Sequence, residues 1–438
     1  MSSARENKCL MMDRSILHCD CNGFFASVEC LDQPQYCDVP LAVAGDPKDR
    51  CGIILAKNEL AKKYGIITTE TVYSAKRKCH KLVLVPPRHW RYEEISKQVN
   101  LIYLQYTDQV EPFSIDESFL DVTGSLDYFH ATAHELADRI RKQVKNGIGI
   151  TISVGVSFNK TFAKLGSDMK KPNATTEITR KNYKTLVWSL PTHDMMFIGK
   201  AGVEILQKNY INTIGDLARK PKEVIVHLLG KSGEALWEKA NGLDSDPVRL
   251  FSDREIVKSI GRGMTYRRDL NNEEEIRQGV IALTDEVAVR LRENGLKAST
   301  LQVTIKDTFL KTISRQVTLS IPTHLQKELI DSAMAIIRAN WHIMPNGRCS
   351  PIRALTITGQ NLVRGNETAE QMSLFDFVDG TKPSLQRSKR EKLENAIEQL
   401  RAKHGSRIIS LGYVENEELG IRQFGRHGDN HGVDHNYW

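Results

Sequence analysis

Two short acidic segments at the edges of apolar, strand-like runs constrain this chain more than any other feature. Asp20 follows the apolar run 15–19, and Asp116 and Glu117 stand directly before another such run. A carboxylate at the edge of an apolar strand is costly without a partner, and adjacent carboxylates raise each other's pKa. Divalent cations relieve both effects. We therefore expect a fold in which several strand ends meet around a cation.

Acidic ligands with no nearby histidine favour a magnesium site. Three carboxylates suit Mg²⁺ that is shared with substrate phosphates, as two-metal phosphoryl transfer requires. The alternative for Asp116 and Glu117 is a solvated turn, because Asp-Glu pairs are common. The order strand, acidic tip, strand, followed by a turn at 121–124, favours the site.

The composition is that of a soluble globular protein with several domains. At 438 residues the chain predicts two to four domains, and 40% apolar with 26% charged residues leave ample core. No apolar run approaches membrane-spanning length, and residues 1–8 lack a signal-peptide hydrophobic region. We therefore expect a cytoplasmic protein. The net charge of +7, from 61 basic and 54 acidic residues, permits nucleic-acid binding.

The cysteines and the histidine-rich tail do not predict a zinc site or a disulfide scaffold. Eight cysteines in a chain of this length, without Cys-x-x-Cys or Cys/His spacing, are expected to be mostly reduced core thiols. Cys19 and Cys21 flank Asp20 on a strand and should face the opposite side from it. Three tail histidines recur every four residues and are expected to bind metal only incidentally: His427, His431 and His435.

The pattern of apolar residues divides the chain into modules. Residues 15–178 alternate strands with covering helices, which predicts one mixed sheet that carries the acidic cluster. Residues 180–248 read as short helices, and residues 252–363 as a self-contained α+β unit. A linker at 364–380 precedes an amphipathic helix and a tail rich in Gly, His and Asn. The apolar stripe of that helix consists of Leu393, Ile397 and Leu400.

Three sequence blocks carry a resemblance to a known family. They are residues 20–29 (Asp-Cys-Asn-Gly-Phe-Phe-Ala-Ser-Val-Glu), residues 114–118 (Ser-Ile-Asp-Glu-Ser), and residues 162–165 (Phe-Ala-Lys-Leu) together with 168–173 (Asp-Met-Lys-Lys-Pro-Asn). Their content and order closely resemble those of the Y-family translesion DNA polymerases. The match spans residues 13 to about 363, which is most of the chain.

The resemblance implies an α+β multidomain fold of the right-hand polymerase type, with a palm, short fingers, a helical thumb and an α+β little finger. Short fingers that close loosely are expected to tolerate damaged templates. The expected boundaries are 13–22 and 86–178 for the palm, 23–85 for the fingers, 179–248 for the thumb, 252–363 for the little finger, 364–380 for a linker, and 381–438 for a C-terminal helix and flexible tail.

The resemblance also implies roles for the acidic residues. Asp20, Asp116 and Glu117 match the family's catalytic, metal-binding carboxylates, with the main-chain carbonyl of Cys21 as a further ligand. Two Mg²⁺ ions at these ligands imply template-directed transfer of dNMP from dNTP to a primer 3′-hydroxyl.

Several positions are expected to contact the incoming nucleotide. Phe25 falls at the family's steric-gate position, where a ring beneath the sugar excludes a 2′-hydroxyl. Phe24, Lys62 and Lys171 are expected to bind the dNTP. Plain helix core is the alternative for Phe24 and Phe25, and adjacent positions on a helix cannot both face one way.

The fingers depart from the family's usual phosphate contacts. The usual threonine, tyrosine and arginine are here Ala56, Glu59 and Lys62. Lys62 keeps the charge of an arginine but not its bidentate fork. Glu59 should repel a triphosphate unless it pairs with Lys62 or Lys63 along the helix.

Two further modules are expected to hold DNA. Residues 196–217 resemble a helix-hairpin-helix, whose backbone N–H groups bind phosphates, although Phe197 replaces its first glycine. A purely structural helical linker is the alternative. In the little finger, Arg262, Arg267 and Arg268 lie on one predicted strand and are expected to follow the DNA backbone. A solvated edge strand is the alternative there.

The linker contains a peptide that resembles the sliding-clamp ligand of bacterial polymerases, Gln371-Met372-Ser373-Leu374-Phe375. Leu374 and Phe375 would fill an apolar pocket, and Gln371 would hydrogen-bond to its rim. Such peptides bind weakly alone because ordering them costs entropy.

These features together predict a damage-tolerant, template-directed DNA polymerase of the translesion class, with low processivity, acting as a monomer in DNA repair and replication. Its partners would be primer-template DNA, dNTPs and the replication sliding clamp. One alternative is a catalytically silent DNA- or clamp-binding factor on the same fold, which the intact acidic triad disfavours. Another is a different two-metal enzyme, such as a nucleotide cyclase or nuclease, which the clamp-like peptide and the basic third domain disfavour.

Overall fold

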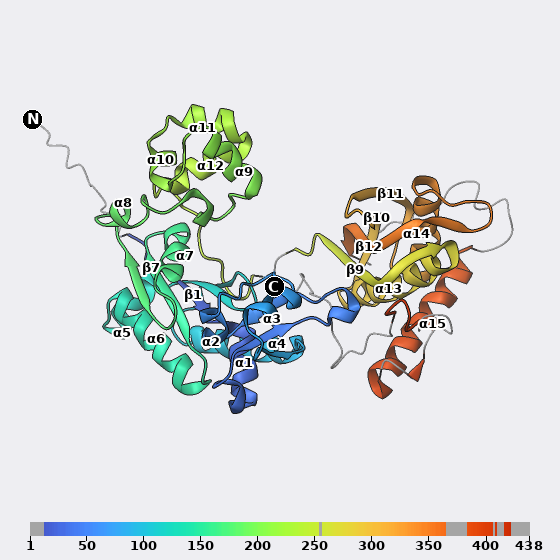
Figure 1. Cartoon of the computed structure of the whole chain (residues 1–438), viewed down its shortest axis with the longest axis horizontal. Coiled ribbons are helices and arrows are strands. Elements are labelled where there is room, and N and C mark those ends of the chain that lie inside the picture. The colour runs from blue at the N-terminus through green and yellow to red at the C-terminus, as the bar shows by residue number, and fades with distance from the viewer. Residues whose placement is uncertain (1–12, 254–255, 365–382, 406–407, 410–415, 422–438) are drawn as a thin grey trace, which may run out of the picture.

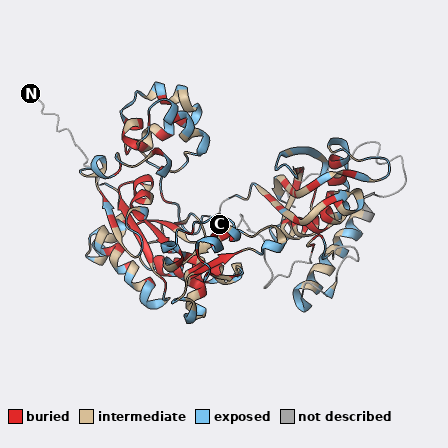
Figure 2. Ribbon diagram, in the orientation of Figure 1, coloured by how far each residue is buried: buried red, intermediate tan, exposed pale blue. Residues whose placement is uncertain are grey.

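The computed structural model describes residues 13–253, 256–364, 383–405, 408–409 and 416–421. A sheet domain, a helical domain above it and a second sheet domain to one side are joined by short segments (Figure 1). Buried residues are concentrated inside each of these bodies (Figure 2). We keep the names palm, fingers, thumb and little finger for them.

The palm is built on a five-stranded sheet whose middle strand carries Asp20. Its order is β5-β6-β1-β7-β8, with β7 and β8 parallel and the other neighbours antiparallel. All six residues of β1 are buried, as expected of a strand that is covered on both faces. The strands are β1 (Ile16–Cys21), β5 (Val110–Pro112), β6 (Glu117–Asp121), β7 (Ile152–Ser157) and β8 (Thr175–Ile178).

Helices cover both faces of the palm sheet. Cys19 and Cys21 lie in one apolar core with residues of α4 and α6. His18 and Asp20 contact side chains of α7 on the other face, because successive strand residues alternate in direction. The prediction that the two cysteines face away from Asp20 is confirmed. The helices are α4 (His89–Tyr103), α5 (Leu126–Phe129), α6 (Ala133–Gly147) and α7 (Lys160–Met169).

The fingers form a small body between β1 and α4. Their sheet has the order β3-β2-β4, and its core consists mainly of small and aliphatic residues such as Ala42, Ile54 and Ala61. Gly65 has a φ of 71° just after α2, the left-handed backbone with which a glycine often ends a helix. The elements are α1 (Phe24–Asp32), β2 (Leu41–Ala44), β3 (Ile54–Lys57), α2 (Glu59–Lys63), α3 (Val72–Lys78) and β4 (Val83–Val85).

The thumb is a cluster of short helices that packs on one end of the palm. Leu206, Ile214 and Ile225 of the thumb share a core with Phe162 of α7. Phe197, which stands in place of a hairpin glycine, has a φ of 69° and thus adopts the left-handed backbone that a glycine usually supplies. The helices are α8 (Tyr183–Leu186), α9 (Lys200–Lys208), α10 (Ile214–Arg219), α11 (Lys222–Leu229) and α12 (Lys231–Ala240).

The little finger is a four-stranded antiparallel sheet with two helices on one face. Its strand order is β11-β10-β12-β9. The α+β unit that the sequence predicted runs in the order strand, helix, strand, strand, helix, strand. The elements are β9 (Ser259–Asn272), α13 (Glu273–Glu293), β10 (Leu296–Asp307), β11 (Thr312–Thr323), α14 (Gln326–Asn340) and β12 (Arg348–Arg364).

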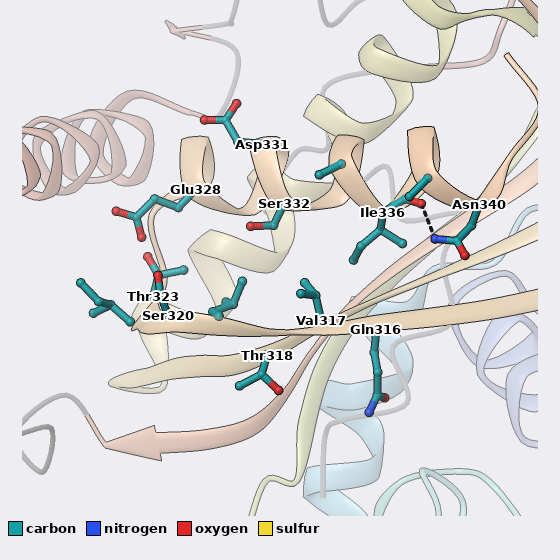
Figure 3. Close-up of a pocket in the computed structure, with 14 residues that line it drawn as sticks. Gln316, Val317, Thr318, Ser320, Thr323, Glu328, Asp331, Ser332, Ile336 and Asn340 are labelled. Carbon is teal, nitrogen blue, oxygen red and sulfur yellow. Dashed lines mark hydrogen bonds between the residues drawn. The ribbon is translucent and has the colours of Figure 1, made fainter. Parts of the chain in front are cut away.

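An open groove separates the edge strand β11 from α14. Val317 and Ser320 line it from the strand, and Glu328, Ser332 and Ile336 line it from the helix (Figure 3). This groove lies on the little finger and not on the palm.

Helix α15 (Pro383–His404) docks on the little finger through charged residues and not through its apolar stripe. Arg292 of α13 lies 2.6 Å from Glu394 and 2.8 Å from Glu398. Leu393 and Leu400 remain exposed. Two of the three residues of the predicted apolar stripe therefore lie in solvent, while Ile397 is half-buried.

Beyond α15 the chain returns to the little finger and completes its core. Leu419 and Ile421 are fully buried among the residues of that core. The N–H of Arg267 in β9 bonds to the carbonyl of Leu419 at 3.0 Å. The flexible tail that the sequence predicted thus includes an ordered piece at 416–421.

A turn of the fingers reaches the little finger (Figure 1), and ion pairs link the two there. Arg50 lies 2.5 Å from Asp269, and Arg267 contacts Asp49. The two acidic and two basic side chains come from one fingers turn and one end of β9.

Two sequence predictions can be compared with the described residues as a whole. All seven cysteines that the structure describes are free thiols, as predicted. No helix in the described segments combines the length and the apolar character that crossing a membrane requires.

Candidate active site

The register of two neighbouring strands brings Asp20 and Glu117 together. They are direct partners in the antiparallel pair β1–β6, which places their Cβ atoms about 4.5–5.5 Å apart. Asp116 immediately precedes β6, and its carbonyl accepts a hydrogen bond from the N–H of Cys21 at 2.9 Å. The carboxylates predicted from two distant segments therefore lie at one edge of the palm sheet.

These carboxylates are largely buried. Asp20 is only 5% exposed. Burial raises the pKa of Asp116, although Ser114 Oγ donates to its Oδ1 at 2.7 Å. Burial likewise raises the pKa of Glu117 to about 7, against the opposing charge of Lys164. Positive charge at this edge of the sheet would stabilise the ionised acids.

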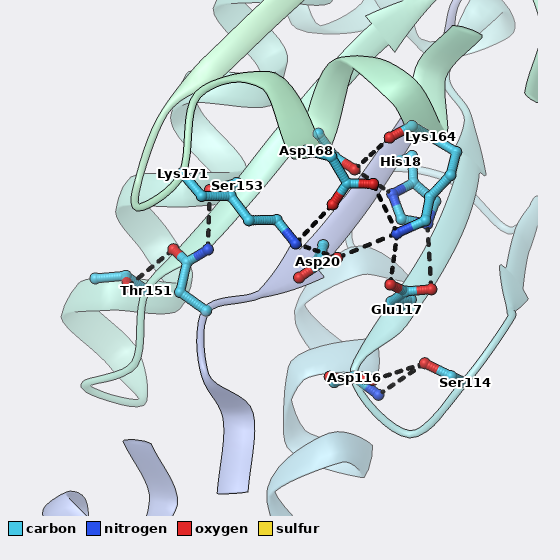
Figure 4. Close-up of polar contacts among 12 residues, drawn as sticks. His18, Asp20, Ser114, Asp116, Glu117, Thr151, Ser153, Lys164, Asp168 and Lys171 are labelled. Carbon is cyan, nitrogen blue, oxygen red and sulfur yellow. Dashed lines mark hydrogen bonds and ion pairs between the residues drawn. The ribbon is translucent and has the colours of Figure 1, made fainter. Parts of the chain in front are cut away.

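Two lysines face the acids (Figure 4). Lys164 Nζ, on α7, lies 2.6 Å from Glu117 Oε1 and 3.3 Å from Asp20 Oδ2. Lys171 Nζ, just beyond the helix, lies 2.7 Å from the same Asp20 oxygen. Burial lowers the pKa of Lys164, but the neighbouring carboxylates outweigh this effect and raise it. The amine of Lys164 is therefore a cation within the acidic cluster.

His18 supports the cluster from inside the sheet–helix interface. Its Nδ1 lies 2.8 Å from Ser167 Oγ, which donates to the Lys164 carbonyl at 2.8 Å. The Nε2 atom of the same ring lies 3.8 Å from Glu117 Oε2. Burial lowers the pKa of His18 well below its usual value, so the ring is neutral.

Asn22 fastens the loop that carries Lys171. Its Oδ1 accepts from the N–H of Asn173 at 2.8 Å and from Thr151 Oγ1 at 3.1 Å. Its Nδ2 donates to Ser153 Oγ at 2.9 Å. The residue that follows Cys21 thus ties β1 both to β7 and to the loop.

The donor chemistry at this edge fits a hard divalent cation. Carboxylate oxygens are the ligands that Mg²⁺ prefers, and buried acids with raised pKa values gain from its charge. In the part of the chain that the structure describes, no three His, Cys, Asp or Glu side chains already surround a metal-sized space. Asp116 turns to Ser114 while Asp20 and Glu117 face the lysines (Figure 4). A cation held by all three would require Asp116 to turn toward the other two.

Phe25 and Phe24 point in different directions, as their helical spacing requires. Phe25 is half-buried and stacks on Tyr92, with ring centroids 4.1 Å apart and planes 11° apart. Phe24 is 3% exposed and belongs to the palm core. The expectation that Phe24 binds the dNTP needs correction, because its side chain presents almost no surface to a ligand.

Two lysines of the fingers, Lys57 and Lys62, lie near each other, and Lys62 pairs with the acidic Glu59. Glu59 and Lys62 are both exposed and lie 3.7 Å apart, so the pairing that the sequence required for Glu59 is present. Lys57 is half-buried and donates to Thr68 Oγ1 at 3.1 Å. Burial, followed by the nearby charge of Lys62, lowers the pKa of Lys57. Lys57 and Lys62 are therefore neighbours.

The three little-finger arginines are engaged with acids. Arg262 is 7% exposed and its Nε lies 3.0 Å from Glu286, so it cannot reach DNA as the sequence predicted. Arg267 contacts Asp49 of the fingers. Arg268 is the most exposed of the three and lies 2.9 Å from Glu275. Arg262 and Arg268 would share a face of a regular strand, but the register of β9 against β12 shifts between Thr265 and Leu270, so their surroundings differ.

Some predicted residues lie outside the described segments, and some residues at the site were not predicted. Gln371, Leu374 and Phe375 lie outside the described residues, as do the tail histidines. Lys164 was part of a family block but had no role, and Lys57 and His18 were not singled out. The spacing of Lys164, Asp168 and Lys171 along one helical face was the available signal for Lys164.

The family models that match this chain agree with its fold and with the acidic edge of its palm sheet. The impB/mucB/samB family matches residues 19–168, and the C-terminal domain of the same family matches residues 257–374. The chain belongs to this family, the Y family of DNA polymerases, and is by membership a DNA-directed DNA polymerase.

Curated relatives are similar over nearly their whole length. A DNA polymerase IV of Acetivibrio thermocellus is 43% identical and covers 92% of this chain and 98% of its own. DNA polymerase IV of Clostridium kluyveri is 36% identical with the same coverage, and DNA polymerase IV 1 of Bacillus subtilis is 33% identical over 92% of this chain and 94% of its own. The sequence blocks pointed to the family to which these relatives belong.

A solved structure shares the fold. A Y-family DNA polymerase chimera, Dbh-Dpo4(243-245)-Dbh, matches with a TM-score of 0.69 over 80% of this chain and 99% of that chain. At 22% identity this likeness concerns the fold alone. The predicted right-hand fold with a palm, fingers, thumb and little finger is confirmed.

Proposed function

We propose that this protein is a translesion polymerase that adds dNMP from dNTP to a primer 3′-hydroxyl by two-metal phosphoryl transfer at Asp20, Asp116 and Glu117. The observation that carries this proposal is the direct pairing of Asp20 with Glu117 across β1 and β6, with Asp116 next in the chain. Two Mg²⁺ ions, when bound, would lower the pKa of the 3′-hydroxyl and neutralise the departing pyrophosphate. Asp20, Asp116, Glu117 and the carbonyl of Cys21 would be their protein ligands.

The chain's other residues would position the nucleotide. Lys171 would contact the triphosphate, and its half-buried amine already lies at the acidic edge. Lys62, with its neighbour Lys57, would supply the positive charge of the fingers in place of the family's arginine. Phe25, held flat against Tyr92, would exclude a 2′-hydroxyl beneath the sugar.

DNA would be held by the thumb and the little finger without reading sequence. Phe197 adopts the backbone of a hairpin glycine, which supports phosphate binding by the N–H groups before α9. Arg268 keeps exposed surface, and Arg267 would become available only if its contact with Asp49 opened. The domain boundaries given by the sequence are part of this proposal, as is a monomeric state.

The experiment that tests the proposed chemistry is primer extension with Asp116→Asn and Glu117→Gln. Each substitution removes one negative ligand while keeping the shape of the side chain, so incorporation should fall at least about a thousandfold. Primer-template binding, measured by fluorescence anisotropy, should stay within about twofold of the unsubstituted protein. Substantial incorporation by either variant would refute the metal assignment.

The same assay separates the rival functions. A silent DNA- or clamp-binding factor would extend no primer with the unsubstituted chain. A nucleotide cyclase or nuclease would convert dNTPs or DNA to products other than extended primer. Extension on both undamaged and lesion-bearing templates is the result that the proposal requires.

Recruitment by the sliding clamp is a separate part of the proposal. Leu374→Ala combined with Phe375→Ala should abolish any stimulation of extension by the clamp, because both apolar anchors are lost. Extension without the clamp should be unchanged, since these residues follow the last polymerase domain. Equal clamp stimulation of the double variant and the unsubstituted chain would argue against this peptide.

A further inference from the structure

Lys164 makes direct contact with two of the three proposed metal ligands. Its amine lies between Glu117 Oε1 at 2.6 Å and Asp20 Oδ2 at 3.3 Å, and its side chain is 15% exposed. The same amine lies 3.3 Å from Asp168 Oδ2. Lys164 therefore has two acceptors inside the acidic cluster and one outside it (Figure 4).

Asp168 is an acceptor shared by both lysines of the site. It is one helical turn after Lys164 and three residues before Lys171, whose amine lies 2.8 Å from Asp168 Oδ1. Asp168 is half exposed, whereas Asp20 is buried. Helix α7 thus offers each amine a solvated alternative to the buried acids.

A divalent cation and the Lys164 ammonium cannot use the same oxygens together. Two positive charges that share Asp20 Oδ2 and Glu117 Oε1 would lie within a few ångströms, where their repulsion is strong in a partly buried site. An ammonium also occupies the lone pairs through which a carboxylate would bind the ion. Binding of the ion therefore requires the amine to move.

We propose that Lys164 is an internal competitor of the catalytic cation, which holds Asp20 and Glu117 until an ion binds them and then moves to Asp168. This inference rests on the proposed function, because the cation belongs to the same site. The ammonium keeps the buried carboxylates compensated, as a buried acid pair requires. Lys164 is in this sense a positioning residue that sets how tightly the polymerase binds its metal.

The proposal makes two opposite demands on metal affinity. Removing the competitor should strengthen binding of the ion, and removing the acceptor to which the competitor moves should weaken it. If α7 served only to support the fold, the two substitutions would not be expected to change the affinity for the ion in opposite directions.

The test measures Mn²⁺ binding to the full chain in the absence of DNA and nucleotide. The electron paramagnetic resonance signal of the free ion gives the amount that is not bound. Lys164→Met should bind Mn²⁺ at least about fivefold more tightly, and Asp168→Asn at least about threefold more weakly. Lys170→Met is the matched control, because it removes the same charge from an exposed neighbour in the same segment. Its Mn²⁺ affinity should stay within about twofold.

A double-variant cycle distinguishes the shared movement from long-range charge. The weakening caused by Asp168→Asn should shrink by more than half when Lys164 is already Met, since the amine that Asp168 receives is gone. Unchanged or weaker Mn²⁺ binding by Lys164→Met would overturn the proposal. Equal strengthening by Lys170→Met, or full additivity in the cycle, would also overturn it. If Lys164→Met does not fold, the exposed Asp168→Asn still carries the test, since unchanged affinity there refutes the movement.

Failure of this inference can be told from failure of the proposed function. If Glu117→Gln abolishes Mn²⁺ binding and primer extension while Lys164→Met behaves like the unsubstituted chain, only the competitor role is refuted. If Glu117→Gln leaves both properties intact, the metal site itself is misplaced.

Discussion

The orientation of Phe25 is fixed by a stack of aromatic and charged residues beneath it. Tyr92 lies flat against the ring, and His89 meets its edge at a centroid distance of 5.7 Å. Tyr92 is held in turn by Glu29, which accepts its hydroxyl proton at 2.7 Å and is clamped by Arg88. A ring held this firmly can exclude a single hydroxyl, because it cannot turn aside at little cost.

Replacement of Phe25 by Leu or Ala should therefore relax sugar discrimination. The preference for dNTP over rNTP should fall at least about tenfold, which corresponds to about 1.4 kcal/mol. The measurement is single-nucleotide incorporation with each sugar on the same primer-template. Phe24→Leu is the control, because that ring lies in the core and its discrimination should be unchanged. Unaltered sugar selectivity of the Phe25 variants would refute the steric-gate role of this residue.

At this scale the sequence could predict charges but not their partners. Asp20, Asp116 and Glu117 were recognisable because acidic residues at strand ends are unusual and because all three lie within the family blocks. The contact of Lys164 with Glu117 depends on how α7 is rotated over the sheet, which no local pattern specifies. The burial of Arg262 escaped prediction because its ion pair with Glu286 lets a charged side chain take a buried position of β9.

The position of α7 depends on how closely it approaches strand β7. Gly155 of β7 lies against the helix, and a Cβ there would stand 1.9 Å from the carbonyl oxygen of Ala163 and 2.5 Å from the nitrogen of Ser167. Both atoms are helix backbone and cannot move without the helix. The absence of a side chain at Gly155 is therefore what lets Lys164 reach the acids.

Gly155→Ala should push α7 away from the sheet and weaken the site. We expect the palm to lose about 1–3 kcal/mol of unfolding free energy, because a methyl group is forced into a filled interface. Incorporation should fall as well, since Lys171 shifts with the helix. Hydrogen exchange of the β7 amides and primer extension measure the two effects. Gly124→Ala, where a Cβ meets nothing within 4 Å, should leave both unchanged; equal behaviour of the two variants would contradict this account.

Elements were more predictable than their lengths. The strand at 16–21 was expected almost where it lies, because a short apolar run is a local signal. The little-finger strands extend several residues beyond their apolar cores, since cross-strand hydrogen bonds continue through polar residues such as those of β11. Helix α15 was expected, but its docking face was not, because ion pairs leave no periodic apolar signal.

The whole molecule is held together by segments that are remote in sequence. Leu419 and Ile421 enter the little-finger core more than fifty residues after β12 ends at Arg364. Glu418 lies 3.2 Å from Arg268, and the carbonyl of Glu417 accepts from Arg267 Nη1 at 3.0 Å. The same arginine contacts Asp49, so the returning segment and the fingers meet at one side chain of β9.

Leu419→Ala should destabilise the little finger. Loss of a fully buried leucine from a core costs about 2–5 kcal/mol. Hydrogen exchange of the β9 and β10 amides should report this loss, while the amides of the palm sheet remain protected. The matched control is Leu400→Ala on α15, where the side chain is exposed and the change should be within about 0.5 kcal/mol. A little finger equally stable in both variants would show that the 416–421 segment is not part of its core.

At the scale of the whole molecule, the sequence predicted the domains but not the contacts that join them. The family resemblance placed the palm, thumb and little finger in order. Nothing in residues 416–421 identifies them as core of a domain that the pattern ends at 363, because two apolar residues in a polar tail have no periodicity.

The late return of the chain to the little finger also sets the order in which the domains can fold during synthesis. The palm core is drawn almost entirely from residues before 180, and it can form while later segments are still being translated. The little finger has all its strands once residue 364 has emerged, yet it lacks two core side chains until residue 421 follows. On the ribosome, the domain expected to grip DNA therefore matures after the domain expected to do the chemistry.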